Sequence, residues 1–346
     1  MRFGLGPFAA EAFGNLDNAG AYEIVGDASV LAENLGFDST WIAERYFTRD
    51  GYCPSAFVAA SDVAARTEAI RIGVLPILGL THPLYFAEDA TTLDNLSAGR
   101  AIIAPINAVS HEIAGYDVAP SEYSARFRES LDVLLDAWSA RPFHHDGQFW
   151  TIPAQLDGHA ENRTGTVTVT PKPVQFELPL WLGGFWSEGR EIAAQYGLPM
   201  VLGAVTATED LPGFWRAYDH DARRGTRAPR ILIRDVYVSA ADDPLEECGA
   251  AFAQQFANYA EWGLWEGDAS DVSALAANRL IVGSPDQVIE TIQALDASNG
   301  IDHLICRMHF PGMSFAQLHA SMTLFAREVI PEFKMPDLPH QIRQGV

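Results

Sequence analysis

The sequence predicts an α/β fold, a closed (β/α)8 barrel in which residues 1–346 form a single domain. Short apolar or β-branched runs alternate with segments of helical spacing along the chain. Eight such runs are present, and none has the polar composition of an edge strand, which favours a closed barrel over an open sheet. The length of 346 residues also lies within the range that such barrels occupy as one unit.

Each expected strand is short, mostly apolar and bounded by Gly, Pro or a charged residue. The expected strands are 3–6, 39–43, 70–76, 101–104, 180–183, 200–203, 231–238 and 303–308. The expected helices are 21–34, 54–65, 83–96, 122–139, 188–195, 209–223, 245–262, 285–297 and 315–328. Gly36 follows the first helix, where a left-handed residue is common, and Pro54, Pro83 and Pro285 suit first helical turns.

Two segments exceed the minimal repeat. Residues 141–178 form a long insertion before the fifth strand and are rich in Gly, Pro and His. Residues 263–278, between the seventh and eighth strands, are acidic and rich in small residues. Long loops in compact domains are often functional, and barrel active sites are built from the loops that follow strands. Residues 263–278 therefore lie where a functional loop is expected, and a loop of this length is usually either a lid or disordered.

The charge balance excludes several classes of partner. The chain has 23 Lys and Arg against 45 Asp and Glu, a formal net charge of −22, so nucleic acid and anionic membrane surfaces are poor partners. The three cysteines, Cys53, Cys248 and Cys306, are too far apart for a disulfide framework or a zinc ribbon. No apolar run is long enough for a membrane span, and no secretory signal is expected. These features favour a cytoplasmic protein.

The common catalytic motifs do not fit. GxSxG, HExxH, CxxC and Walker A patterns do not occur. Residues 4–9 match GxGxxA, but Pro7 and the loop after it delay the next helix, so no helix N-terminus is placed to receive a pyrophosphate. The run 144–146, His-His-Asp, is typical of a hairpin turn, so no metal site is expected.

Charged and aromatic residues follow two expected strands at the end where barrel active sites lie. Glu44 and Arg45 close the second strand, either as functional groups or as a rim ion pair of little energetic value. Trp186, after Gly184, is either a stacking surface for a planar ligand or a core residue. Ser187 opens the next helix, either as an N-cap alone or as one that also helps to hold an anion.

Several segments, in order, resemble one known family. They are 36–41 with Glu44 and Phe47, 81–89, 93–100, 193–200, 282–286 and 300–304. Over nearly the whole chain they are similar to the bacterial luciferase-like, flavin-dependent monooxygenases. The resemblance implies a luciferase-like barrel that holds reduced FMN at its C-terminal mouth, where oxygen forms a flavin C4a-peroxide that attacks a small organic substrate. It also implies a separate flavin reductase, a homodimer or heterodimer formed through the second and third helices, and a mobile lid at 263–278.

The resemblance assigns roles to individual positions. Leu75-Pro76 matches a cis peptide that supports the flavin ring in some members, and a cis X–Pro bond would keep that geometry at low cost. Arg45 stands where members often have His, so it cannot act as a general base, although it could stabilise a peroxide anion or bind an acidic substrate. Asn107 replaces an Arg that grips the flavin phosphate.

The phosphate loop after the fifth strand is also altered. It becomes 184–189, with Gly184, Trp186, Ser187 and Gly189 as the candidate cofactor contacts. Weak flavin binding, a reshaped site or no flavin would each account for these changes. Two alternatives therefore remain: a non-catalytic barrel subunit that partners an active paralogue, and an oxidoreductase dependent on the deazaflavin F420. The anionic tail of F420 would favour basic residues at the mouth, and the sequence offers few.

Overall fold

A computed structural model describes residues 1–8, 17–49, 51–154, 165–184, 187–222 and 227–334. Its main sheet has the parallel order β4-β3-β2-β1-β11-β9-β8-β7. The strands on this path are β1 (Arg2–Phe8), β2 (Ser39–Ala43), β3 (Arg71–Leu75), β4 (Ala101–Ile103), β7 (Leu182–Gly183), β8 (Met200–Leu202), β9 (Arg230–Val238) and β11 (His303–Arg307). A parallel bridge between Ile103 and Leu180 joins the two ends, and the Trp181 N–H donates to the Ile103 carbonyl at 2.8 Å. The expected closed barrel is confirmed.

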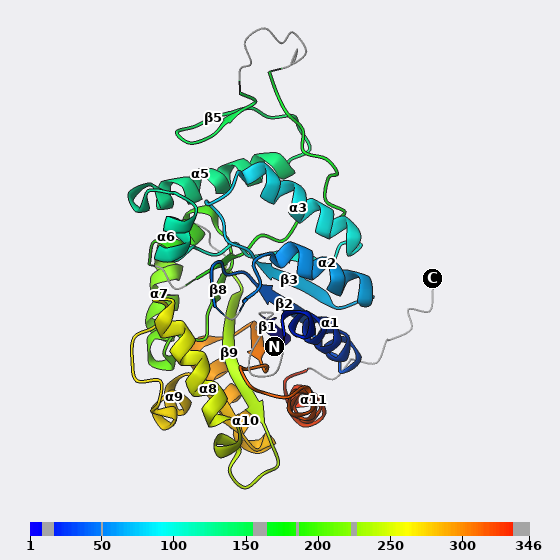
Figure 1. Cartoon of the computed structure of the whole chain (residues 1–346), viewed down its shortest axis with the longest axis vertical. Helices are drawn as coiled ribbons and strands as arrows, with labels where there is room; N and C mark the ends of the chain where they lie inside the picture. The colour runs from blue at the N-terminus through cyan, green and yellow to red at the C-terminus, as the bar shows by residue number, and fades with distance from the viewer. Residues whose placement is uncertain (9–16, 50, 155–164, 185–186, 223–226, 335–346) are drawn as a thin grey trace, which may run out of the picture.

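Helices cover the outside of the sheet (Figure 1). They are α1 (Asn18–Asn34), α2 (Ala56–Arg66), α3 (Pro83–Leu96), α4 (Ser110–Gly115), α5 (Pro120–Trp138), α6 (Ser187–Tyr196), α7 (Leu211–Asp221), α8 (Pro244–Glu261), α9 (Val272–Asn278), α10 (Pro285–Asn299), α11 (Phe315–Leu324) and α12 (Ile330–Phe333). A 3-10 turn, η1 (Thr208–Asp210), precedes α7, and a π-helical turn, η2 (Phe325–Val329), separates α11 from α12. Pro83 and Pro285 open their helices as expected, whereas Pro54 lies before α2, whose N-cap is Ser55.

Bulky side chains fill the end of the barrel opposite the mouth. Trp41 stacks on Trp181 with ring centroids 5.3 Å apart, and both rings contact the edge of His303. Gly73 on the neighbouring strand makes room for Trp41, since a Cβ there would lie 2.2 Å from the indole ring. This end of the barrel is therefore closed by packing, and ligand access is left to the other end.

One strand of the main sheet was not expected from the sequence. β10 (Leu280–Gly283) pairs with the C-terminal half of β9. Asp235 of β9 faces Leu280 in this pairing and Arg307 in the pairing with β11, so β10 and β11 lie on opposite edges of β9. The pairing of β8 with β9 ends at Leu202, and β10 pairs with the edge of β9 beyond that point. A strand of four residues is too short to show a recognisable periodicity in the sequence.

The insertion before the fifth barrel strand lies where the sequence predicted it. It contains a two-stranded antiparallel hairpin, β5 (His145–Asp146) and β6 (Thr151–Ile152), which projects away from the barrel at the top of Figure 1. His145 contacts Glu129 of α5 at 3.2 Å. In the described residues, no three His, Cys, Asp or Glu side chains group as a metal site would require. None of the helices in these ranges combines the length and hydropathy needed to cross a bilayer.

Candidate active site at the barrel mouth

A small cavity of about 70 Å³ lies at the C-terminal ends of the barrel strands. Its floor is apolar, two arginines flank it, and aromatic residues cover it. The lining residues are Pro7, Ala43, Arg45, Tyr52, Leu75, Ile106, Asn107, Gly184, Val201, Gly203, Ala204, Ile233, Tyr259, Trp262, Leu264 and Arg307. Six of the barrel strands contribute residues to this concave surface, and the segments just after β4 and β7 contribute others, which is the usual arrangement of a barrel active site.

Arg45 is buried and held from two sides. Its Nη1 donates to Glu112 Oε2 at 3.3 Å and to the Asn107 carbonyl at 3.2 Å. Glu112 is completely buried and also accepts the backbone N–H groups of Tyr46 at 2.9 Å and Val109 at 2.8 Å. These bonds compensate the buried carboxylate and fix the guanidinium at the cavity wall.

A second buried arginine was missed by the sequence interpretation. Arg307, the last residue of β11, lies 3.4 Å from Asp235 Oδ1, and its Nη1 donates to the Tyr259 hydroxyl at 2.6 Å. Asp235 is completely buried, and this burial raises the pKa of its carboxyl although Arg307 opposes the effect. Arg307 ends an apolar strand that the sequence did predict, whereas Asp235 lies inside one. The rule that singled out the charged end of the second strand would therefore also have found Arg307.

Glu44 does not line the cavity. Its buried carboxyl accepts the backbone N–H of Ile77 at 2.7 Å and that of Ala56 at 3.1 Å, and it also bonds the Tyr46 hydroxyl. Burial raises the pKa of Glu44 to about 7, although these hydrogen bonds favour the charged form. Glu44 therefore ties the loops after β2 and β3 to the start of α2. This geometry makes it a positioning residue for the mouth.

The expected cis bond at Leu75-Pro76 is wrong. The cis peptide bonds of the described residues are Gly6-Pro7, Ile152-Pro153 and Thr170-Pro171. At Leu75-Pro76 the parallel ladder continues, because the Pro76 carbonyl accepts the Ile106 N–H at 2.9 Å and the next residue pairs with Ile106. A trans peptide keeps the strand extended through this position. Leu75 lines the cavity, whereas Pro76 is buried beside it.

The candidate phosphate-site residues separate into two groups. Asn107 and Gly184 meet at the cavity wall, where a Cβ on Gly184 would lie 2.9 Å from Asn107 Oδ1. Gly184 also has φ +138°, a conformation that favours glycine. Gly189 is buried within α6 and is not part of the lining. Trp186 lies outside the described residues, and for Ser187 the structure describes only that its backbone opens α6.

The end of α8 covers the mouth. Tyr259 and Trp262 contribute to the lining, and Tyr52 packs edge-on against Trp262 with ring centroids 5.2 Å apart. The chain then turns through Gly263, at φ +71°, to Leu264, which also lines the cavity. The first residues of the expected lid therefore do reach the site. Its later part forms α9, which packs against α8 and β10.

Comparison with known proteins decides the family. A sequence model described as "Luciferase-like monooxygenase" matches residues 1–303. The chain belongs to the luciferase-like monooxygenase family. The alkanal monooxygenase alpha chain of Photobacterium leiognathi is 24% identical over 338 residues, which cover 89% of this chain and 92% of that protein. The F420-dependent glucose-6-phosphate dehydrogenase of Nocardia farcinica is 26% identical over 343 residues, covering 91% and 95%.

Solved structures of luciferase-like monooxygenases have the same fold. Monooxygenase RslO1 from Streptomyces bottropensis has a TM-score of 0.83 at 24% identity, covering 96% of this chain and all of that one. The oxygenating constituent of 3,6-diketocamphane monooxygenase from Pseudomonas putida, solved in complex with FMN, has a TM-score of 0.78 at 20% identity, covering 97% and 100%. The expected family and barrel are thus confirmed, and the protein is an oxidoreductase of this family.

Proposed function

We propose that this enzyme is a flavin-dependent monooxygenase that uses reduced FMN and O2 to oxygenate a small apolar organic substrate. The observation that carries the proposal is the pair of buried guanidinium groups, Arg45 and Arg307, beside an otherwise apolar cavity at the mouth. A reduced flavin ring is planar, largely apolar and readily anionic, so this combination of walls suits it. When bound, reduced FMN would supply the electrons that activate O2 for transfer of one oxygen atom to the substrate.

The residues of the mouth would have different roles in this reaction. Leu75 and Ile106 would present an apolar surface to the ring, and the two arginines would favour negative charge that develops there. Trp262 and its aromatic neighbours would exclude water from the reaction. Because the free volume is only about 70 Å³, this cover would have to move when the cofactor enters.

The relatives support two cofactor candidates. The structural neighbours include an FMN complex and two F420-dependent enzymes, and one curated relative is also F420-dependent. We favour FMN because the described lining of the cavity offers two arginines and no lysine, which is little positive charge for the polyanionic tail of F420. A separate reductase in the cytoplasm would deliver the reduced FMN, and a second copy of the chain would complete a homodimer.

The test is an anaerobic titration of the purified chain with FMN, photoreduced FMN and reduced F420, followed by mixing with 18O2 and a panel of apolar aldehydes and cyclic ketones. We expect saturable binding of reduced FMN, and one 18O atom in an organic product. Binding of reduced F420 alone would replace FMN with the second candidate. Consumption of O2 that yields only hydrogen peroxide with every substrate would contradict a monooxygenase.

Substitution of Arg45 tests whether reduced FMN binds at the barrel mouth. Arg45→Gln removes the charge but keeps a donor for Glu112, so we expect the chain to fold and to bind reduced FMN at least about tenfold more weakly. The matched control is Arg49→Met, which removes a side chain that is 94% exposed a few residues along the same segment. Equal affinities for the two variants would remove Arg45 from the site.

A further inference from the structure

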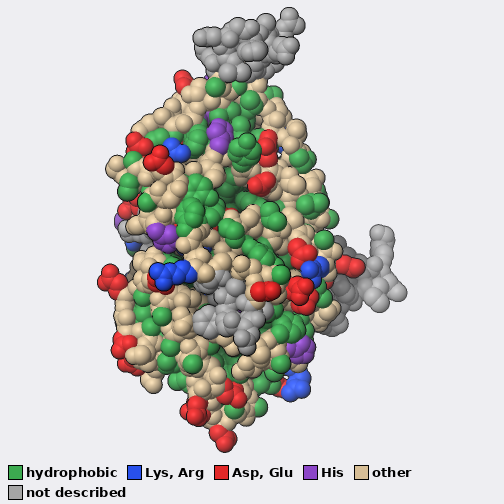
Figure 2. Space-filling view, in the orientation of Figure 1, with side chains coloured by type: hydrophobic (Ala, Val, Ile, Leu, Met, Phe, Trp, Pro, Cys, Tyr) green, Lys and Arg blue, Asp and Glu red, His purple; other side chains and the backbone are tan. Residues whose placement is uncertain are grey.

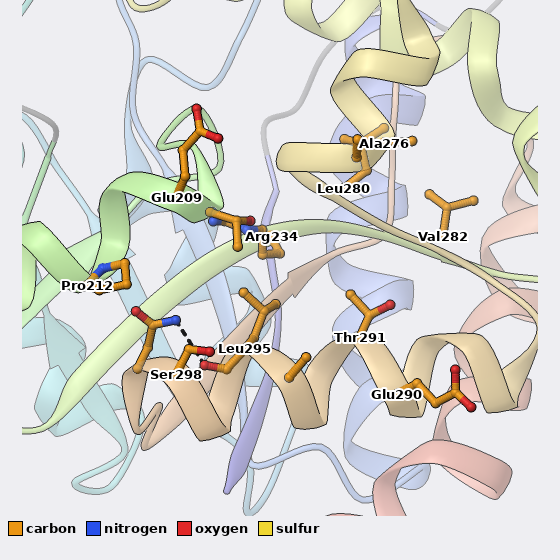
Figure 3. Close-up of a pocket in the computed structure, with 14 residues that line it drawn as sticks. Glu209, Pro212, Arg234, Ala276, Leu280, Val282, Glu290, Thr291, Leu295 and Ser298 are labelled. Carbon is orange, nitrogen blue, oxygen red and sulfur yellow. Dashed lines mark hydrogen bonds between the residues drawn. The ribbon is translucent and has the colours of Figure 1, made fainter.

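A larger cavity, of about 640 Å³, lies outside the barrel, and the proposed flavin chemistry does not use it (Figure 3). Its walls come from η1 and α7, from β9, and from α9, β10 and α10. Its volume falls within the range of small-ligand sites, which is roughly 300–1,000 Å³. Whether it can bind a ligand depends on the chemistry of its walls.

The cavity forms at a gap beside β9. The pairing of β9 with β8 ends at Leu232, and its pairing with β10 begins at Asp235. Ile233 and Arg234 occupy the interval between these two partners. Side chains alternate along a strand, and Ile233 lines the barrel mouth, so Arg234 points to the opposite side, toward the helices.

Arg234 lies among the lining residues, between Glu209 and Leu295 in Figure 3. Its side chain is 1% exposed. Nη1 donates to the adjacent Ile233 carbonyl at 3.2 Å, but Nε and Nη2 have no hydrogen-bond partner within the described ranges. A buried guanidinium with unmade hydrogen bonds is costly. Both nitrogens are closed off from water, so a small rotation of the guanidinium toward the cavity is needed to bring them to an anion, which would then supply both missing acceptors.

We propose that this cavity binds a small organic carboxylate with a short apolar chain, and that Arg234 is its anchor. The planar fork of a guanidinium matches the two oxygens of a carboxylate. Ala276, Leu280 and Val282 form apolar walls that suit a hydrocarbon chain. Glu209 and Glu290 belong to the lining as well, and their negative charges oppose polyanions such as phosphate more strongly than a single carboxylate.

The first experiment is calorimetric titration of the full chain with hexanoate, with its uncharged analogue hexanamide and with inorganic phosphate. We expect hexanoate to bind at one site, and the other two probes to bind at least about tenfold more weakly. Hexanoate affinity no greater than that of hexanamide would show that Arg234 binds no anion. Tighter binding of phosphate would overturn the carboxylate assignment.

Two pairs of variants test the location. Arg234→Met should weaken hexanoate binding at least about tenfold, while Arg216→Met, which removes an exposed arginine from α7, should not. Ala294→Trp places a bulky ring at the exposed rim of the cavity and leaves Arg234 intact, so it tests the site even if the first variant does not fold. Its control is Ala297→Trp on the same helix, outside the lining. Hexanoate binding that survives both Arg234→Met and Ala294→Trp would overturn the proposal.

Crystals soaked with 6-bromohexanoate give the direct measurement. Anomalous scattering from bromine is expected in the cavity beside Arg234. Bromine at the barrel mouth instead, or competition between hexanoate and reduced FMN, would mean that the carboxylate is a ligand of the mouth. This outcome would leave the proposed flavin chemistry intact, so the two proposals can fail separately.

Discussion

At the scale of single residues, the mouth depends on buried carboxyl groups that no ligand needs to touch. Glu44 joins the loop after β3, the start of α2 and the Tyr46 hydroxyl through hydrogen bonds. Glu112 does the same for Arg45 and the segment after β4. Carboxyls of this kind fix the positions of strand ends that carry the reactive groups, and they do so at the cost of burying charge.

The pH dependence of stability should reveal Glu44. In the folded chain the pKa of this carboxyl is about 7, whereas in the unfolded chain it has its ordinary pKa of 4.5. Between these values the folded state binds more protons, so stability falls as the pH rises. The contribution is fully present below pH 4.5 and is lost as the pH passes 7. The loss is about 3 kcal/mol in the free energy of unfolding.

Urea unfolding of the wild type and of Glu44→Gln between pH 4.5 and 8 measures this contribution. We expect the wild type to lose stability relative to the variant as the pH rises, because glutamine does not titrate. Glu23→Gln, which makes the same substitution at an exposed position on α1, is the control for the change of residue type. A constant difference between Glu44→Gln and the wild type would contradict the raised pKa.

At the scale of elements, the end of α8 and the turn after it control access to the mouth. Trp262 packs against Tyr52 above the cavity, while Trp265, three residues later, packs on Phe256 away from the lining. If reduced FMN enters here, Trp262→Leu should speed its binding several-fold and should raise the share of O2 lost as hydrogen peroxide, because water then reaches the site.

Stopped-flow binding and peroxide assays of this variant make the comparison. Trp265→Leu removes a ring of the same kind from the same turn and should leave both quantities near the wild-type values. An unchanged binding rate for Trp262→Leu would mean that the cofactor enters by another route.

The same elements show what the sequence could and could not predict. Buried barrel strands were found because they are continuous apolar runs with clear ends, and the insertion and the turn at Gly36 follow from Gly and Pro. β10 and α9 were missed because four- and seven-residue elements show too little periodicity. The cavity beside Arg234 could not be predicted, since it depends on where two neighbours of β9 stop and start pairing.

The candidate site was predictable only in part. Arg45, Leu75, Asn107 and Gly184 reach the mouth because parallel strands end at one rim. The role of Glu44 as a tie between loops depends on hydrogen bonds to backbone groups distant in sequence, which no local pattern reveals. The peptide geometry at Leu75-Pro76 depends on the neighbouring strand in the same way.

At the scale of the whole molecule, the net charge of −22 is carried on the surface, and acidic side chains recur across the face in Figure 2. Several of the arginines are instead buried, at the mouth and beside the outer cavity. This distribution disfavours nonspecific association with anionic partners. Any stable self-association must therefore use an apolar surface rather than charge attraction.

The packed helices α2 and α3 offer such a surface. Val58 on α2 and Tyr85 on α3 are each 71% exposed, although their helices pack against each other. We propose that they form the homodimer interface.

Val58→Asp would bury a charge there and should weaken dimerisation at least about tenfold. Sedimentation velocity at micromolar concentration should show a dimer for the wild type and monomers for Val58→Asp. Phe176→Asp, at an exposed apolar residue in the insertion, should remain dimeric. A monomeric wild type, or a dimer that tolerates Val58→Asp, would exclude this interface.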